Sequence, residues 1–218
     1  MGERTTESSM EGQRDALLDK ALHGDQQALA ELFEMHRNRL RRMIVLRMDA
    51  RLRARLDASD VVQEAYVQLA RRIADYGKRN ELPFFLWLRL IAGEQLAQLH
   101  RMHLGTAKRD AGRELAQGRM DMPQVSTFCL AEHLAGQYTS VDRNLLRAEA
   151  EQRLKIALDC LEASDREILA MRNFEELSTE EIGLSLGLTR SGVLKRYTRA
   201  VRRLREAFSR LTDTRRPM

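Results

Sequence analysis

Near the C-terminal end of the chain, apolar and basic residues recur with the period of an α-helix. This pattern constrains the fold more than any other feature. The segment Leu188–Phe208 reads LTRSGVLKRYTRAVRRLREAF and has no acidic residue before Glu206. At about 100° per residue, its apolar residues fall within an arc of roughly 100°, and most basic residues fall opposite. The apolar arc contains Val193, Tyr197, Ala200, Val201, Leu204, Phe208 and Leu211, and the basic face contains Lys195, Arg196, Arg199, Arg202 and Arg203. The pattern predicts a long helix with one buried face and one cationic face.

The composition favours helices along the rest of the chain. Among 218 residues there are only 12 glycines and 3 prolines, while 32% of the residues are charged. Few residues are therefore suited to hairpin turns. Aromatic residues make up 5% of the chain, which fits small aliphatic helical bundles better than a β-sandwich. We predict an all-α protein.

Helical periodicity divides the chain into two blocks with an irregular segment between them. The first block spans residues 11–103 and the second spans residues 142–213. The segment between them, residues 104–141, has glycines at positions 105, 112 and 118 and a proline at 123. Such a composition is typical of a linker, with one short helix expected near FCLAEHLA. We therefore predict two small helical bundles joined by a flexible linker.

Several polar residues mark expected helix starts. Ser59 is the predicted N-cap of a helix that begins with DVVQEA. In the second block, Ser164 with Glu167 and Ser178 with Glu181 match the capping-box pattern S-x-x-E before an apolar residue.

Three helices are expected in the second block, at about 165–173, 178–186 and 190–210. Gly187 lies where the middle one would need a left-handed residue to end. A short capped helix, a glycine turn and a longer basic helix form the layout of a helix-turn-helix, whose second helix enters the DNA major groove. The apolar stripe would hold that helix on its bundle, which leaves the cationic face for phosphates and base edges.

Other classes of protein find little support in the sequence. The two cysteines, Cys129 and Cys160, cannot build a disulfide framework, and we expect a cytoplasmic protein. No apolar run approaches a membrane span. His100 and His103 have HxxH spacing but lack further ligands. The sequence contains no glycine-rich phosphate loop and no catalytic grouping attached to a motif. We therefore predict no enzymatic activity, no metal and no cofactor.

The first block contains the segments DASDVVQEAYVQL and FFLWLRLIA, and the second contains LSTEEIGLSLGLTRSGVLKRYTRAVRRLRE. With these segments, both blocks together resemble the RNA polymerase sigma factors of the compact, two-domain extracytoplasmic-function type. In the first block, DASDVVQEAYVQL is similar to the family's D-x-x-D-V-V-Q-E-A-F segment, and FFLWLRLIA to its W-L-x-x-I-A segment. In the second, LSTEEIGLSLGLTRSGVLKRYTRAVRRLRE resembles the family's terminal helix-turn-helix. The matches cover about residues 11–103 and 145–210 in the right order. The resemblance implies binding to core RNA polymerase and to promoter DNA, and it allows an anti-sigma factor as a further partner.

The resemblance also implies roles for individual residues. The contacts to core polymerase would come from Asp60, Val61, Gln63 and Glu64. The melted minus-ten strand would be held by Lys78, Arg79, Asn80, Phe85, His100 and Arg101. The bases of the minus-thirty-five element would be read by Lys195, Thr198 and Arg199, since Lys and Arg suit guanine O6 and N7. Phosphates near that element would be held by Arg190, Ser191, Arg196 and Arg203.

The chain departs from the family pattern at several positions. Gly93 and Glu94 replace the frequent Arg-Asn pair. The usual E-I-A of the turn is E-I-G, which places Gly183 inside a helix at a cost of about 1 kcal/mol relative to Ala. The alternative function is that of a stand-alone helix-turn-helix regulator whose N-terminal block senses a ligand or a partner. Such a regulator should bind duplex operator DNA tightly without residues 1–103, whereas a compact sigma factor alone should bind promoters poorly.

Overall fold

The computed structural model describes residues 3–78, 82–104, 122–138 and 144–213, and within these residues it contains ten α-helices and no β-strand. The helices are α1 (Glu3–Leu22), α2 (Gln26–Arg47), α3 (Ala50–Arg53), α4 (Ala58–Lys78), α5 (Phe84–Leu104), α6 (Thr127–Tyr138), α7 (Asn144–Asp159), α8 (Ala163–Asn173), α9 (Thr179–Leu186) and α10 (Arg190–Asp213). The all-α prediction is confirmed. None of the described helices combines the length and the hydrophobicity that a bilayer-crossing segment needs.

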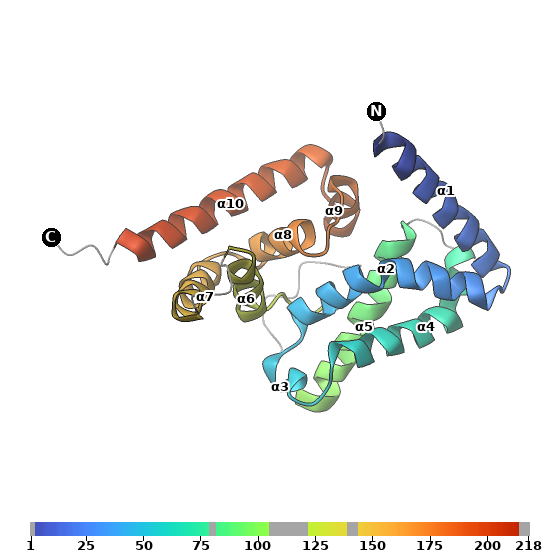
Figure 1. Cartoon of the computed structure of the whole chain (residues 1–218), viewed down its shortest axis with the longest axis horizontal. Helices are drawn as coiled ribbons and strands as arrows, with labels where there is room; N and C mark the ends of the chain where they lie inside the picture. Colours follow the sequence, from blue (N-terminus) through green and yellow to red (C-terminus); the bar gives the residue numbers. More distant parts are fainter. Residues whose placement is uncertain (1–2, 79–81, 105–121, 139–143, 214–218) are drawn as a thin grey trace.

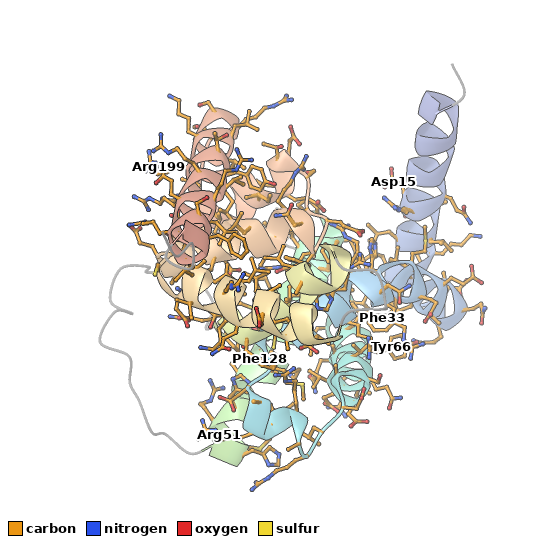
Figure 2. All side chains as sticks on the ribbon, turned by 60° about the vertical axis from the view of Figure 1, so that its left-hand side comes forward. Asp15, Phe33, Arg51, Tyr66, Phe128 and Arg199 are labelled. Carbon is orange, nitrogen blue, oxygen red and sulfur yellow. The ribbon has the colours of Figure 1, made fainter. Side chains whose placement is uncertain are left out.

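Helices α1 to α5 form the first bundle (Figure 1). Its core contains Leu40, Met43, Ile44, Val61, Leu69, Leu88 and Ile91. The rings of Phe33 and Tyr66 meet edge to face between α2 and α4, with centroids 5.0 Å apart (Figure 2). Asp25 begins α2, because its carboxylate accepts the N–H groups of Gln27 and Ala28 and so satisfies two donors that a helix start leaves open.

Helices α6 to α10 form the second bundle, in which α6 packs along α7. Cys129 and Leu130 of α6 are buried against Leu158 and Phe174. The short helix predicted near FCLAEHLA is therefore present as α6. It lies inside the segment 104–141 that the sequence presents as a linker, yet it packs as a member of the second bundle. Residues 105–121 and 139–141 of that segment lie outside the described residues.

The predicted helix starts have different outcomes. The capping box of α9 is confirmed, because Ser178 Oγ accepts the Glu181 N–H at 3.0 Å and Glu181 Oε2 accepts the Ser178 N–H at 2.8 Å. Gly187 ends α9 with a left-handed φ of 64°, as predicted. The capping box at Ser164 is wrong. Helix α8 starts two residues earlier, with Glu162 as its N-cap and no side-chain capping bond.

The prediction for Ser59 is also wrong. Helix α4 already begins at Ala58. The Asp57 carboxylate accepts the Ser59 N–H at 2.7 Å, so Asp57 satisfies the donor that a capping residue would take.

The two bundles pack against each other along a seam that the sequence gives no reason to expect (Figure 1). Phe85 and Leu86 of α5 join the apolar cluster of Ile168 and Ile182 in the second bundle. Leu46 of α2 is buried in the cluster that contains Leu130. We call this contact the interbundle seam.

Candidate functional site

Helices α9 and α10 and the turn between them have the geometry of a helix-turn-helix. A side chain at Gly183 would place its Cβ 2.8 Å from the backbone oxygen of Leu188. The close approach of the turn to α9 therefore requires glycine there, which explains the departure from the usual alanine. Val193 and Ala200 hold α10 on the bundle from its buried face, and the Tyr197 hydroxyl donates to Asn173 Oδ1 of α8 at 3.1 Å.

The opposite face of α10 carries the residues that the sequence assigns to base reading. Lys195, Thr198 and Arg199 are exposed, and Arg199 lies on the outer side of the helix (Figure 2). Among the described residues, no carboxylate pairs with Lys195 or with Arg199. These two cations are thus available to an external anion, as the amphipathic pattern predicts.

The four residues assigned to phosphates lie in different environments. Arg190 is exposed, with its guanidinium 3.6 Å from Glu180, and the Ser191 hydroxyl lies 3.2 Å from that of Thr189. Arg196 is half-buried and lines a pocket of about 580 Å³ between α5, α8 and α9. Arg203 Nη1 lies 2.7 Å from Asp165 and 3.2 Å from Glu162. Arg203 therefore ties α10 to the start of α8, and its charge is already matched by two carboxylates.

The residues assigned to core polymerase lie on α4. Asp60, Gln63 and Glu64 are exposed, with the Asp60 carboxylate accepting the Asp57 N–H at 3.0 Å. Val61 is fully buried in the core of the first bundle and offers no surface to a partner. The exposed residues form a polar and acidic strip at the start of the helix.

The residues assigned to the minus-ten strand are spread over several places. Lys78 is exposed at the end of α4 and Arg101 is exposed near the end of α5. Arg79 and Asn80 lie outside the described residues. His100 is half-buried, and its Nε2 accepts the Asp49 N–H at 3.3 Å. Burial lowers the pKa of His100, which favours the neutral imidazole that this bond requires.

Phe85 is the minus-ten residue whose position differs most from the expectation. It is 3% exposed, in the apolar cluster of the interbundle seam. The guanidinium of Arg39 covers its ring, 3.8 Å from the centroid. In this conformation Phe85 is closed to a DNA base.

A cluster of four charges lies in the middle of the interbundle seam, and we call it the seam cluster. It consists of Arg47 of α2, Arg89 of α5, Glu167 of α8 and Glu175 after α8. Glu175 binds both arginines, with distances of 2.6 Å to Arg47 Nη1 and 2.6 Å to Arg89 Nε. Glu167 also pairs with both, at 3.1 Å from Arg89 Nη2.

Three members of the seam cluster are almost completely removed from water. The side chains of Arg47 and Glu175 are 0% exposed and that of Arg89 is 5% exposed. Burial alone would raise the pKa of Glu175, but the charges of Arg47 and Arg89 outweigh burial and lower it to about 2. Glu175 is therefore ionised at neutral pH, and the cluster consists of two cations facing two anions.

Comparison with known proteins identifies the family. Residues 157–206 match the family described as Sigma-70, region 4. SigD of Mycobacterium tuberculosis, named an ECF RNA polymerase sigma factor, is 30% identical over 200 residues, covering 91% of this chain and 85% of SigD. The chain belongs to the extracytoplasmic-function RNA polymerase sigma factors. The RNA polymerase sigma-H factor of Pseudomonas aeruginosa is 27% identical to this sigma factor over 194 residues, covering 86% of this chain and 90% of that protein.

The fold of the sigma factor is also similar to a solved structure. CnrH, solved in complex with the cytosolic domain of CnrY, matches with a TM-score of 0.53 and 21% identity, over 94% of this chain and 99% of CnrH. At this identity the likeness concerns the fold alone. The match confirms the all-α fold over almost the whole chain.

Sequence reasoning missed the seam cluster in this sigma factor. Arg47 and Glu167 are 120 positions apart, and Arg89 and Glu175 are 86 apart, so no local spacing connects them. Glu167 fits the capping-box pattern with Ser164, which predicts a local role for it. A signal that points toward the cluster is the run of eight arginines from Arg37 to Arg55, in which Arg47 lies at helical spacing from the apolar Met43 and Ile44.

Proposed function

We propose that this sigma factor binds core RNA polymerase through its first bundle and directs transcription initiation by contacting two promoter elements. Membership of the family supports this function as a whole. The observation that carries it in the structure is the exposed cationic face of α10, where Lys195 and Arg199 have no carboxylate partner among the described residues. The protein would act in the cytoplasm, where the polymerase is found, and without catalysing a reaction itself.

For the minus-thirty-five element, we propose that α10 enters the major groove. Lys195, Thr198 and Arg199 would read base edges, because Lys and Arg donate to guanine O6 and N7. Arg190, Ser191 and Arg196 would hold phosphates that set the register of the helix. Arg203 would act mainly by fixing α10 on α8 through Asp165, since its charge is already balanced.

For the minus-ten element and the polymerase, the first bundle supplies the candidate contacts. Asp60, Gln63 and Glu64 on α4 would meet a basic surface of core polymerase. The melted strand would lie against residues at the ends of α4 and α5, with stacking on an aromatic ring offsetting the cost of unstacking bases. The candidates here are Lys78, Arg79, Asn80, Phe85, His100 and Arg101.

An anti-sigma factor is proposed as a further partner. CnrH was solved with the cytosolic domain of CnrY, and a protein partner of comparable kind would suit a factor whose activity needs control. No residue of this chain is assigned to that contact.

Purified full-length protein mixed with core RNA polymerase provides the test. We expect co-elution with the polymerase large subunits and run-off transcripts from a subset of promoters of the source genome. Absence of both core binding and transcripts would contradict the function. Tight binding of the isolated protein to duplex DNA that persists after deletion of residues 1–103 would instead support the stand-alone regulator.

A further inference from the structure

The exposed face of α10 contains one residue that the cationic pattern does not explain. Leu194 is 52% exposed, and among the described residues of α10 it is the only large apolar side chain that is exposed. The other exposed residues in the first three turns can all form hydrogen bonds: Arg190, Ser191, Lys195, Thr198 and Arg199. A single exposed leucine is common on protein surfaces, so only its position on the helix can assign it a role.

Leu194 lies beside the residues that are assigned to base reading. Helix α10 packs on α7, α8 and α9 and lies along the outer edge of the second bundle (Figure 1). Ser191, Leu194 and Thr198 follow one another at spacings of three and four residues, so they form one column on the exposed side of the helix. Leu194 belongs to the second turn of α10, which begins at Arg190. In a helix-turn-helix, the N-terminal residues of the second helix are those that contact base edges.

The chemistry of leucine restricts what Leu194 can contact on promoter DNA. Its side chain has no charge and no hydrogen-bonding group, so it gains nothing from a phosphate or from the polar edge of a base. The major groove offers one apolar group, which is the C5-methyl group of thymine. Contact between the leucine and that methyl group removes apolar surface of both partners from water, which is favourable. A G·C pair at the same place would leave the leucine against polar atoms.

We propose that Leu194 is a specificity-determining residue of the minus-thirty-five contact and selects an A·T pair by packing against the methyl group of its thymine. This inference rests on the proposed entry of α10 into the major groove. Leu194 and Thr198 are four residues apart, which is about 6 Å along the helix. At 3.4 Å per step this distance corresponds to roughly two base pairs. The selected pair therefore lies within about two base pairs of the pair that Thr198 reads.

Replacement of thymine by deoxyuridine in the promoter tests this contact, because it removes the C5-methyl group alone and keeps the base pair. The probe is a promoter duplex from which the holoenzyme gives a run-off transcript, with each thymine of the minus-thirty-five element replaced in turn on either strand. Fluorescence polarisation measures the binding of holoenzyme reconstituted from the full-length chain and core polymerase. In the wild type we expect one such replacement to weaken binding about fourfold, which is the effect of losing one buried methyl group.

Two variants of Leu194 separate the methyl contact from other effects. Leu194→Ala removes the partner of the methyl group, so the same deoxyuridine should change the affinity of this variant less than about 1.5-fold, and the two changes are coupled in a double-mutant cycle. Leu194→Met keeps an apolar side chain of similar length and should retain the dependence on the methyl group. Ala and Met both favour helices, so we expect unchanged folding, which circular dichroism would check.

Leu184→Ala is the matched control. It removes the same atoms from a leucine that is 53% exposed on α9, outside the surface that is assigned to base reading. The holoenzyme that contains this variant should respond to the deoxyuridine as the wild type does.

Equal responses to every deoxyuridine in the wild type and in Leu194→Ala would overturn the proposal, and so would a minus-thirty-five element without an A·T pair. A loss of promoter binding in Leu194→Ala that is the same with thymine and with deoxyuridine would also overturn it, since Leu194 would then contact something other than the methyl group. All these outcomes come from a holoenzyme that binds its promoter. Absence of core binding and of any transcript would contradict the proposed function of the chain instead.

Discussion

Individual basic side chains of this sigma factor differ in whether the fold has already balanced their charge. Arg203 lies 2.7 Å from Asp165 and Arg89 lies 2.6 Å from Glu175, whereas Lys195 and Arg199 have no carboxylate partner among the described residues. Amphipathic periodicity assigns Arg199 and Arg203 to the same cationic face. Only the tertiary structure shows that Arg203 is paired with carboxylates, whereas Arg199 has no carboxylate partner among the described residues. Arg199 is therefore available to an external anion, while Arg203 holds α10 on α8.

Replacement of Lys195 or Arg199 by Ala tests base reading. We expect a loss of about 1–3 kcal/mol in promoter binding by the holoenzyme, with relaxed specificity at particular positions of the minus-thirty-five element. Run-off transcription from promoters with single base changes would measure it. Arg196→Ala, which removes a proposed phosphate contact, should weaken all promoters about equally. An equal loss across all sequences for Lys195→Ala would assign Lys195 to phosphate contact as well.

His36 makes the stability of the protein depend on pH. Burial, together with the charges of Arg39 and Arg14, lowers the pKa of His36 from 6.5 to about 4, and its ring packs beside Phe84 and Phe85. The unfolded chain therefore gains a proton below pH 6.5 while the folded protein does not until about pH 4. The free energy of unfolding should fall over this window, by up to about 3 kcal/mol at 1.36 kcal/mol per pKa unit.

Urea denaturation at several pH values would measure the contribution of His36. The difference in the free energy of unfolding between the wild type and His36→Gln should change progressively between pH 6.5 and pH 4. It should stay constant above that range. His103→Gln alters an exposed histidine and serves as the control. Its free energy of unfolding should depend on pH in the same way as that of the wild type. A difference between wild type and His36→Gln that is independent of pH would contradict the argument.

At the scale of elements, the two S-x-x-E motifs provide a matched pair for measuring a helix cap. The Ser178 hydroxyl caps α9, so Ser178→Ala should lower the free energy of unfolding by about 0.5–2 kcal/mol. Ser164 makes no capping bond at the start of α8, and Ser164→Ala should change stability by less than about 0.5 kcal/mol. Denaturant titration of the full-length variants would measure both. Equal losses of stability in Ser178→Ala and Ser164→Ala would contradict a capping role for Ser178 that Ser164 lacks.

The helices themselves were largely predictable because they depend on residues close together in sequence, but two of the three predicted N-caps, Ser59 and Ser164, were wrong. Periodicity located α8, α9 and α10, and Gly187 marked the end of α9. The roles of Glu167 and Phe85 were not predictable. Glu167 fits a local motif yet pairs with arginines 120 and 78 positions away, and a pattern along one helix cannot show that another bundle covers Phe85. The amphipathic pattern located the cationic face of α10 correctly, since that face depends on α10 alone.

At the scale of the whole molecule, α6 decides where the second folding unit begins. A fragment of residues 124–213 retains Leu130 over Leu158 and Phe174, whereas a fragment of residues 142–213 leaves these two uncovered. We expect the longer fragment to unfold cooperatively and to be more stable by about 1.5–3 kcal/mol or more, which is the free energy of burying one Leu side chain. Thermal and urea denaturation followed by circular dichroism would measure the difference. Identical unfolding midpoints would place the boundary after α6.

The opposite charges on the two sides of the seam also limit how this protein can be recombined with its relatives. Arg47 and Arg89 stay buried only while Glu167 and Glu175 face them. A hybrid that joined this N-terminal half to a foreign C-terminal half without acids at the two equivalent positions would contain orphan guanidinium groups. In such a chimaera the two bundles would not pack against each other along the seam. Exchanges between paralogues would therefore be tolerated only when both halves changed together.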